Sequence, residues 1–183
     1  MTTHCVCLIN KLISLVLDTT YYNKEHKNLL ENFVGNSYTL FEALKRKGIG
    51  SKRMIVQNVS QNLKIVLNTI SDINYANIEL RKKGILIHIT KGLRNYTWAI
   101  PFYHLVIYKT NSFSIHAQGK FIQFEKSKNF YENKVFLSSL LNEKNVNSSS
   151  FDGDRSFAAS SKPFSLYHLQ CKRKRNKLFK TYG

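Results

Sequence analysis

Between residues 74 and 124 the sequence alternates apolar and polar side chains in short segments, and this pattern constrains the fold more than any other feature. A repeat of two residues is typical of β-strands that bury one face. The connections are short and carry turn residues, as in Lys82-Lys83-Gly84 and Gln118-Gly119-Lys120. Because no crossover helix fits between such strands, we expect an antiparallel meander or a small barrel. The predicted strands are 54–56, 75–80, 85–90, 96–100, 105–108, 113–116 and 121–124, whereas residues 63–70 fit either a strand or a helix.

Helical patterns lie on both sides of the strands. Apolar residues within 5–17 and within 24–34 recur at helical spacing, and Gly35 ends the second pattern. Thr39 and Glu42 form a capping box that begins a third helix. These three predicted helices make up the first fifty residues.

The third predicted helix carries Leu40, Phe41 and Leu44, has Lys45, Arg46 and Lys47 in its last turn, and ends at Gly48. Cations in a last turn favour the helix dipole, so a ligand role for the three cations is only one of two readings. After the strands, residues 127–142 predict an amphipathic helix, which Ser127 or Asn129 can cap.

Together these segments predict an α+β protein with one sheet-containing domain. Residues 145–165 are rich in Ser, and the end of the chain is strongly basic. The predicted organisation is an N-terminal helical segment (1–50), an antiparallel sheet with a packing helix (53–142), a flexible Ser-rich linker (143–165) and a disordered basic tail (166–183).

Charge is the outlier of the composition. The chain has 28 Lys and Arg against 11 Asp and Glu, which gives a formal net charge of +17. AT-rich codons favour Lys, but they also favour Glu, so coding bias does not explain the sign of the excess. A surface of this kind attracts polyanions: nucleic acid, anionic lipid or an acidic protein.

The second half of the strand region resembles a pleckstrin-homology or GRAM-like domain. The resemblance covers residues 84–142 and rests on the antiparallel strands, the Ile100-Pro101-Phe102-Tyr103 step, the hairpin that ends in Gly119–Phe124, and the amphipathic helix that follows. It implies a non-catalytic module that binds lipids or proteins. It also implies that the final helix covers one end of the sheet and leaves the other end open.

The basic turns separate by geometry, because a seven-residue strand spans roughly 23 Å and successive hairpin turns lie at opposite ends. The first predicted group consists of Arg81, Lys82, Lys83 and Lys120, and the second of Lys91, Arg94, Lys109, Lys126 and Lys128. If the helix covers the second end, the first group forms the binding surface for an anionic protein or a lipid headgroup.

Motifs for catalysis or metal binding are incomplete. His88, His104 and His116 lie on separate predicted strands, and the chain has only four Asp. Tyr96 and Trp98 fall on one strand face, which favours a core position over base stacking. We therefore expect neither an enzyme nor a metal or cofactor site.

The three cysteines have no zinc-ligand spacing, and Cys5 and Cys7 lie in an apolar stretch. Free buried thiols fit a reducing compartment, which predicts a cytoplasmic protein. The longest apolar run, 5–17, is too short to span a membrane.

A second function class uses the end of the chain. Six cations and no acid lie in the tail, tethered by the Ser-rich segment, a pattern that suits a phosphate backbone and predicts nucleic-acid or ribosome binding. These cations are Lys172, Arg173, Lys174, Arg175, Lys177 and Lys180.

Overall fold

The computed structural model describes residues 15–68, 73–110 and 112–153, with side chains described as far as residue 147. Contacts divide the chain into two units, 1–150 and 151–183, and the fold reported below is that of the first unit. It contains helices and an antiparallel sheet, so the predicted α+β class is confirmed. Within the described residues, none of the helices combines the length and the apolar character that a bilayer-spanning helix requires.

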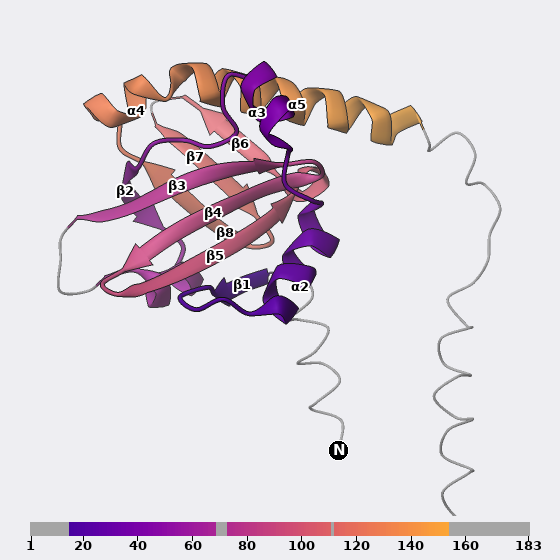
Figure 1. Ribbon diagram of the computed structural model, residues 1–183. Coiled ribbons are helices and arrows are strands. Elements are labelled where there is room, and N and C mark those ends of the chain that lie inside the picture. The colour runs from indigo at the N-terminus through magenta and orange to yellow at the C-terminus, as the bar shows by residue number, and fades with distance from the viewer. Residues whose placement is uncertain (1–14, 69–72, 111, 154–183) are drawn as a thin grey trace, which may run out of the picture. The chain divides into compact units, whose positions relative to one another are not determined.

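Within the described residues, eight strands form one sheet in the order β1-β5-β4-β3-β2-β8-β7-β6 (Figure 1). Strands β2 to β5 form one meander and β6 to β8 a second, and the antiparallel pairing of β2 with β8 joins them. The strands are β1 (Leu15–Asp18), β2 (Met54–Val59), β3 (Asn74–Arg81), β4 (Gly84–Lys91), β5 (Arg94–Pro101), β6 (Val106–Lys109), β7 (Phe113–Ala117) and β8 (Lys120–Phe124).

The helices precede, interrupt and follow the sheet. Along the described chain they are α2 (Lys24–Val34), α3 (Leu40–Lys45), the 3-10 turns η1 (Gln61–Val66) and η2 (Phe102–His104), α4 (Lys128–Glu132) and α5 (Lys134–Gly153). The segment predicted as either strand or helix is therefore the 3-10 turn η1 over its first part, while residues 69 and 70 lie outside the described residues.

One core lies between the two meanders and the C-terminal helices. Trp98 is fully buried, and Tyr96 on the same face packs against the core, as the alternation predicts. Phe113 and Phe124 contribute from the second meander, and Leu140 contributes from α5. A single hydrophobic cluster therefore connects both halves of the sheet with the C-terminal helix.

A glycine allows β4 and β5 to approach closely at the start of β4. A Cβ on Gly84 would lie 2.3 Å from the carbonyl oxygen of Ile100 and 2.8 Å from the Cα of Pro101. Both of these are backbone atoms, which cannot move aside as a side chain can. The pairing of Gly84 with Pro101 therefore depends on the missing side chain.

The outer face of β4 and β5 is also covered. Leu86 and Ala99 point away from the main core and form a second small cluster with Val34 of α2. Leu15 of β1 and Phe33 of α2 pack against it. In Figure 1, α2 and β1 accordingly lie together beside β5.

Two predicted boundaries are wrong. Leu15–Asp18 is a strand and not the end of a helix, because it pairs with the exposed edge of β5, while residues 5–14 lie outside the described residues. Pairing with a neighbouring strand outweighs the local helical spacing here. The C-terminal helix is interrupted at the buried Asn133 and continues to Gly153, so residues 143–153 are not a linker.

The predicted bounds of α2 are correct. Helix α3 begins after Thr39 as predicted, but it ends at Lys45 and not at Gly48, and its orientation is unexpected. The capping box is present, with the backbone N–H of Thr39 donating to Glu42 Oε2 over 2.7 Å. The apolar side chains of α3 face solvent, at 83% exposure for Leu40, 86% for Phe41 and 77% for Leu44. Ion pairs of the polar face, Glu42 with Lys82 and the following Arg46 with Glu143, hold the helix to the rest of the fold.

Candidate functional site

The first predicted basic group does not form one surface. Arg81 ends β3, and the turn after it carries Lys82 and Lys83. Lys120 begins β8, which runs beside the far end of β2, where the N–H of Ser60 donates to the Phe121 carbonyl oxygen. Lys120 therefore lies at the opposite end of the strands from the other three. The prediction assumed one continuous meander, but β8 pairs with β2 and this reverses the second meander relative to the first.

The end that carries Arg81, Lys82 and Lys83 is not open either. Arg81 Nη2 lies 2.8 Å from Glu79 Oε1, and Lys82 Nζ lies 3.3 Å from Glu42 Oε1. The backbone N–H of Lys83 donates to the carbonyl oxygen of Val34 at the end of α2. Helices α2 and α3 therefore cover the end predicted to bind, and two of its three cations already have carboxylate partners.

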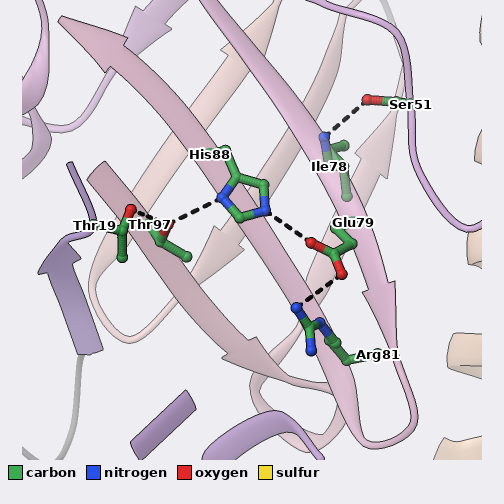
Figure 2. Close-up of polar contacts among 7 residues, drawn as sticks. All are labelled: Thr19, Ser51, Ile78, Glu79, Arg81, His88 and Thr97. Carbon is green, nitrogen blue, oxygen red and sulfur yellow. Dashed lines mark hydrogen bonds and ion pairs between the residues drawn. The ribbon is translucent and has the colours of Figure 1, made fainter. Parts of the chain in front are cut away.

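A row of polar side chains crosses the outer face of the first meander (Figure 2). His88 is its centre: Nε2 lies 3.0 Å from Glu79 Oε2, and Nδ1 lies 3.0 Å from the hydroxyl of Thr97. The Thr97 hydroxyl also lies 2.8 Å from that of Thr19, just after β1. The row therefore connects β3, β4 and β5 with the segment that follows β1. The strand register explains the row. His88 pairs with Thr97 on β5 and with Asn77 on β3, and Glu79 lies two residues after Asn77 on the same face of β3.

Glu79 is held as a carboxylate by this row. Burial favours the neutral acid, but the hydrogen bond with His88 and the charge of Arg81 outweigh it and lower the pKa of Glu79 below its usual value.

A second polar contact lies next to Glu79 on β3. The N–H of Ile78 donates to the hydroxyl of Ser51 over 2.8 Å, which ties the segment before β2 to β3 (Figure 2).

The row contains a hydroxyl, an imidazole and a carboxylate in the order used by acyl-transfer enzymes. In those enzymes the hydroxyl must reach a substrate. The Thr97 side chain is 1% exposed and its hydroxyl is shared between Thr19 and His88, so a reactant has no access to it. The arrangement therefore serves to join strands.

The opposite end of the first meander presents cations and exposed apolar side chains together. We call this surface the hairpin end and define it by five residues: Lys64 and Ile65 of η1, and Lys91, Leu93 and Arg94 of the β4–β5 hairpin. Lys91 Nζ donates to the Ile65 carbonyl oxygen over 2.8 Å, which holds the two tips side by side. Leu93 is 96% exposed and Ile65 is 76% exposed. Neither 61–66 nor 91–94 contains an acidic residue.

The second predicted basic group is divided between the two ends. Lys91 and Arg94 lie at the hairpin end, whereas Lys109 and Lys126 lie near the β6–β7 turn, where Lys126 Nζ donates to the Thr110 carbonyl oxygen. Lys128 begins α4 beside them. Phe130 of α4 packs against Phe113 near Lys109 and Lys126, so the helix covers only this part of the second group and not, as was predicted, the whole group.

The remaining predicted site residues do not converge. His88 lies on the outer face of β4, while His104 and His116 line a hollow beside the second meander. Among the described residues, there is no group of three His, Cys, Asp or Glu placed to hold a metal ion. The six cations of the tail, with the nucleic-acid function assigned to them, lie outside the described residues.

Sequence reasoning missed two parts of this arrangement. Glu79 and His88 sit at outward positions in the alternation, but only the register shows that they meet. Leu93 stands between Gly92 and Arg94 in a tight turn, where polar residues are usual, so its exposure could have been predicted.

Comparisons of the chain with protein families, with curated proteins and with solved structures found no match.

Proposed function

We propose that this protein is a non-catalytic binding module, pleckstrin-like in type, that docks onto an anionic lipid surface through the hairpin end. The observation that carries the proposal is the combination of Leu93 and Ile65, both exposed, with Lys64, Lys91 and Arg94 around them. Side chains as exposed as these add little to the packing of the described residues. Beside cations they suit the boundary between lipid headgroups and acyl chains.

The magnitudes support weak, reversible docking. Each cation near an anionic membrane contributes about 1 kcal/mol, and burying a Leu side chain contributes about 1.5–3 kcal/mol. The two tips are already held together by the Lys91–Ile65 hydrogen bond, so docking does not have to order them. An acidic protein is the other anionic partner, but it would not require Leu93 to stand alone at the tip.

The order of the elements supports the pleckstrin-like part of the proposal. Two antiparallel meanders are followed by a helix that packs on the same core, and this is the succession that the sequence resemblance implies for the region. The end away from that helix is the hairpin end, so the helix leaves it uncovered.

Vesicle sedimentation of the full chain tests the proposal, with vesicles of phosphatidylcholine alone and of phosphatidylcholine mixed with phosphatidylserine. We expect sedimentation only with phosphatidylserine, about tenfold weaker binding for Leu93→Ser, and a further loss for Leu93→Ser combined with Arg94→Glu. Because each comparison is made within the full chain, the basic tail contributes equally to every variant.

Two matched variants serve as controls. Leu40→Ser removes another strongly exposed leucine, from α3, and Lys83→Glu reverses an exposed cation at the other end of β4. Binding that falls as much in these controls as in the hairpin variants would indicate general charge attraction and would refute the assignment to the hairpin end. Binding to an acidic protein with none to vesicles would replace the lipid by a protein partner.

A further inference from the structure

A pocket lies between the β6–β7 turn and the two C-terminal helices, in the part of the chain that the structure describes. Its volume is about 320 Å³, which is within the range of sites that bind small ligands. Four apolar side chains line it: Phe113 of β7, Phe130 of α4, and Leu137 and Leu141 of α5. We call this site, together with the three lysines described below, the helix pocket.

The apolar part of the helix pocket is held in place by packing and hydrogen bonds. The rings of Phe113 and Phe130 pack with their centroids 5.5 Å apart. At the break between α4 and α5, Asn133 Oδ1 accepts the backbone N–H of Lys52 over 2.8 Å, and Asn133 Nδ2 donates to the carbonyl oxygen of Asn129 over 2.8 Å. These bonds tie α4 to the segment before β2, so a ligand would meet walls that are already ordered.

Three cations line the same pocket. They are Lys109 at the end of β6, Lys126 just before α4, and Lys134 at the start of α5. None of the residues that line the pocket is acidic. Among the described residues, no carboxylate lies within ion-pair distance of any of these three lysines. Their positive charge therefore remains available to an anion.

The contacts that these lysines do make are with uncharged groups. Lys126 Nζ donates to the carbonyl oxygen of Thr110 over 3.1 Å, and Lys134 Nζ lies 4.9 Å from the ring centroid of Tyr131. The ammonium group of Lys109 has no hydrogen-bond or ion-pair partner among the described residues. Because an ammonium group has three donors, each of the three lysines can still donate to a ligand.

From this combination we propose that the helix pocket binds a long-chain fatty acid, with the carboxylate at the lysines and the acyl chain against the apolar side chains. The two carboxylate oxygens accept several hydrogen bonds, so they can serve more than one ammonium group. An acyl chain carries no polar groups, which suits walls made of phenylalanine and leucine. An acidic peptide fits less well, because each of its residues would bring an N–H and a C=O group against hydrocarbon.

The helix pocket is separate from the hairpin end. None of the five residues that define the hairpin end lines the pocket. The two sites also differ in the ligand that they suit, because the pocket would take a single dissolved molecule and the hairpin end a lipid surface. Each proposal can therefore fail without the other.

Isothermal titration calorimetry of the full chain tests the proposal, with dodecanoate below its micelle concentration as the probe. We expect saturable binding of dodecanoate and much weaker binding of dodecyltrimethylammonium, which has the same chain and the opposite charge. From octanoate to dodecanoate the dissociation constant should fall about fourfold for each methylene that becomes buried. In NMR spectra of the same titration, the methyl signals of Leu137 and Leu141 should shift.

Two pairs of variants locate the site, and each pair changes exposed residues, so that the fold is preserved. Lys109→Met should weaken dodecanoate binding about three- to tenfold, whereas Lys24→Met removes an exposed cation of α2 and should change it little. Ser138→Phe fills the pocket and should abolish binding. Asn142→Phe adds the same side chain to α5 at a position that does not line the pocket and should leave binding intact.

The proposal would be overturned by a lack of dodecanoate binding, by equal binding of dodecyltrimethylammonium, or by an affinity that does not grow with chain length. Equal losses within either pair of variants would also overturn it, because the site would then lie elsewhere. Leu93→Ser should leave dodecanoate binding unchanged, and Ser138→Phe should leave the sedimentation with phosphatidylserine vesicles unchanged. This cross-comparison shows which of the two sites has failed if one of them does.

Discussion

Glu79 shows how a single residue depends on its neighbours. Its carboxylate contacts both His88, over 3.0 Å, and Arg81, over 2.8 Å, and the side chain is only 24% exposed. A group whose pKa is lower in the folded than in the unfolded state stabilises the fold above its unfolded pKa. That contribution is lost as the pH falls through the folded pKa.

We expect Glu79→Gln to lower the free energy of unfolding at pH 7 by about 1–3 kcal/mol, because a charged acceptor is replaced by a neutral one. The difference from the natural protein should shrink as the pH falls below about 4.3, the usual pKa of glutamate. Urea unfolding across a pH series measures both effects. Glu132→Gln, which removes an exposed partner of Lys52, is the control and should show a smaller change at pH 7. An equal loss at pH 3 and pH 7 would contradict the electrostatic explanation.

Among the helices, α3 and α5 differ in whether their leucines are exposed or buried. Both carry leucines at helical spacing, yet Leu44 of α3 is 77% exposed and Leu140 of α5 is fully buried. The polar residues decide the orientation of α3, because Glu42 pairs with Lys82 and Arg46 pairs with Glu143. Arg46 also lies 4.4 Å from the ring centroid of Tyr38.

This contrast predicts very different effects for the same substitution in two helices. Leu44→Ala should change the free energy of unfolding by less than about 0.5 kcal/mol, whereas Leu140→Ala should cost about 2–5 kcal/mol through a cavity in the core. Chemical denaturation of the two variants measures the difference. A cost of several kcal/mol for Leu44→Ala would mean that another part of the protein covers α3.

In the described part of the molecule, the strands of both meanders and the C-terminal helices contribute to one hydrophobic core. The same hydrophobic cluster contains Met54 of β2, Trp98 of β5, Phe124 of β8 and Leu137 of α5. As far as the chain is described, the two meanders therefore share one core, and their strands pair with each other through β2 and β8. Such a fold should lose its structure in one cooperative step.

Trp98 is the only tryptophan in the chain and is fully buried, so its fluorescence reports on this shared core. We expect blue-shifted emission in the folded protein and weak quenching by acrylamide. Unfolding in urea followed by Trp98 fluorescence and by far-ultraviolet circular dichroism should give coincident curves. A second transition seen by circular dichroism, after the Trp98 signal has changed, would show that the second meander or the helices unfold separately.

Local patterns sufficed for most of the elements. The alternation at 75–80 and 85–90, the capping box at Thr39 and the stop at Gly35 each depend on residues close in sequence, and each appears in the structure where it was expected. The strand at Leu15–Asp18 could not be predicted in this way, because the edge of β5 that it pairs with lies about eighty residues away.

The sequence by itself determined the α+β class, the antiparallel strands, their inward faces and the positive charge, since these follow from side-chain chemistry and local geometry. The tertiary structure alone decided which basic residues lie together. Pairing of β2 with β8 placed Lys120 away from Arg81. Contacts of α2 and α3 with Lys82 and Lys83 cover the end that was predicted to be open. The reason is physical: strand order and register are set by the burial of the whole core, and no short segment contains that information.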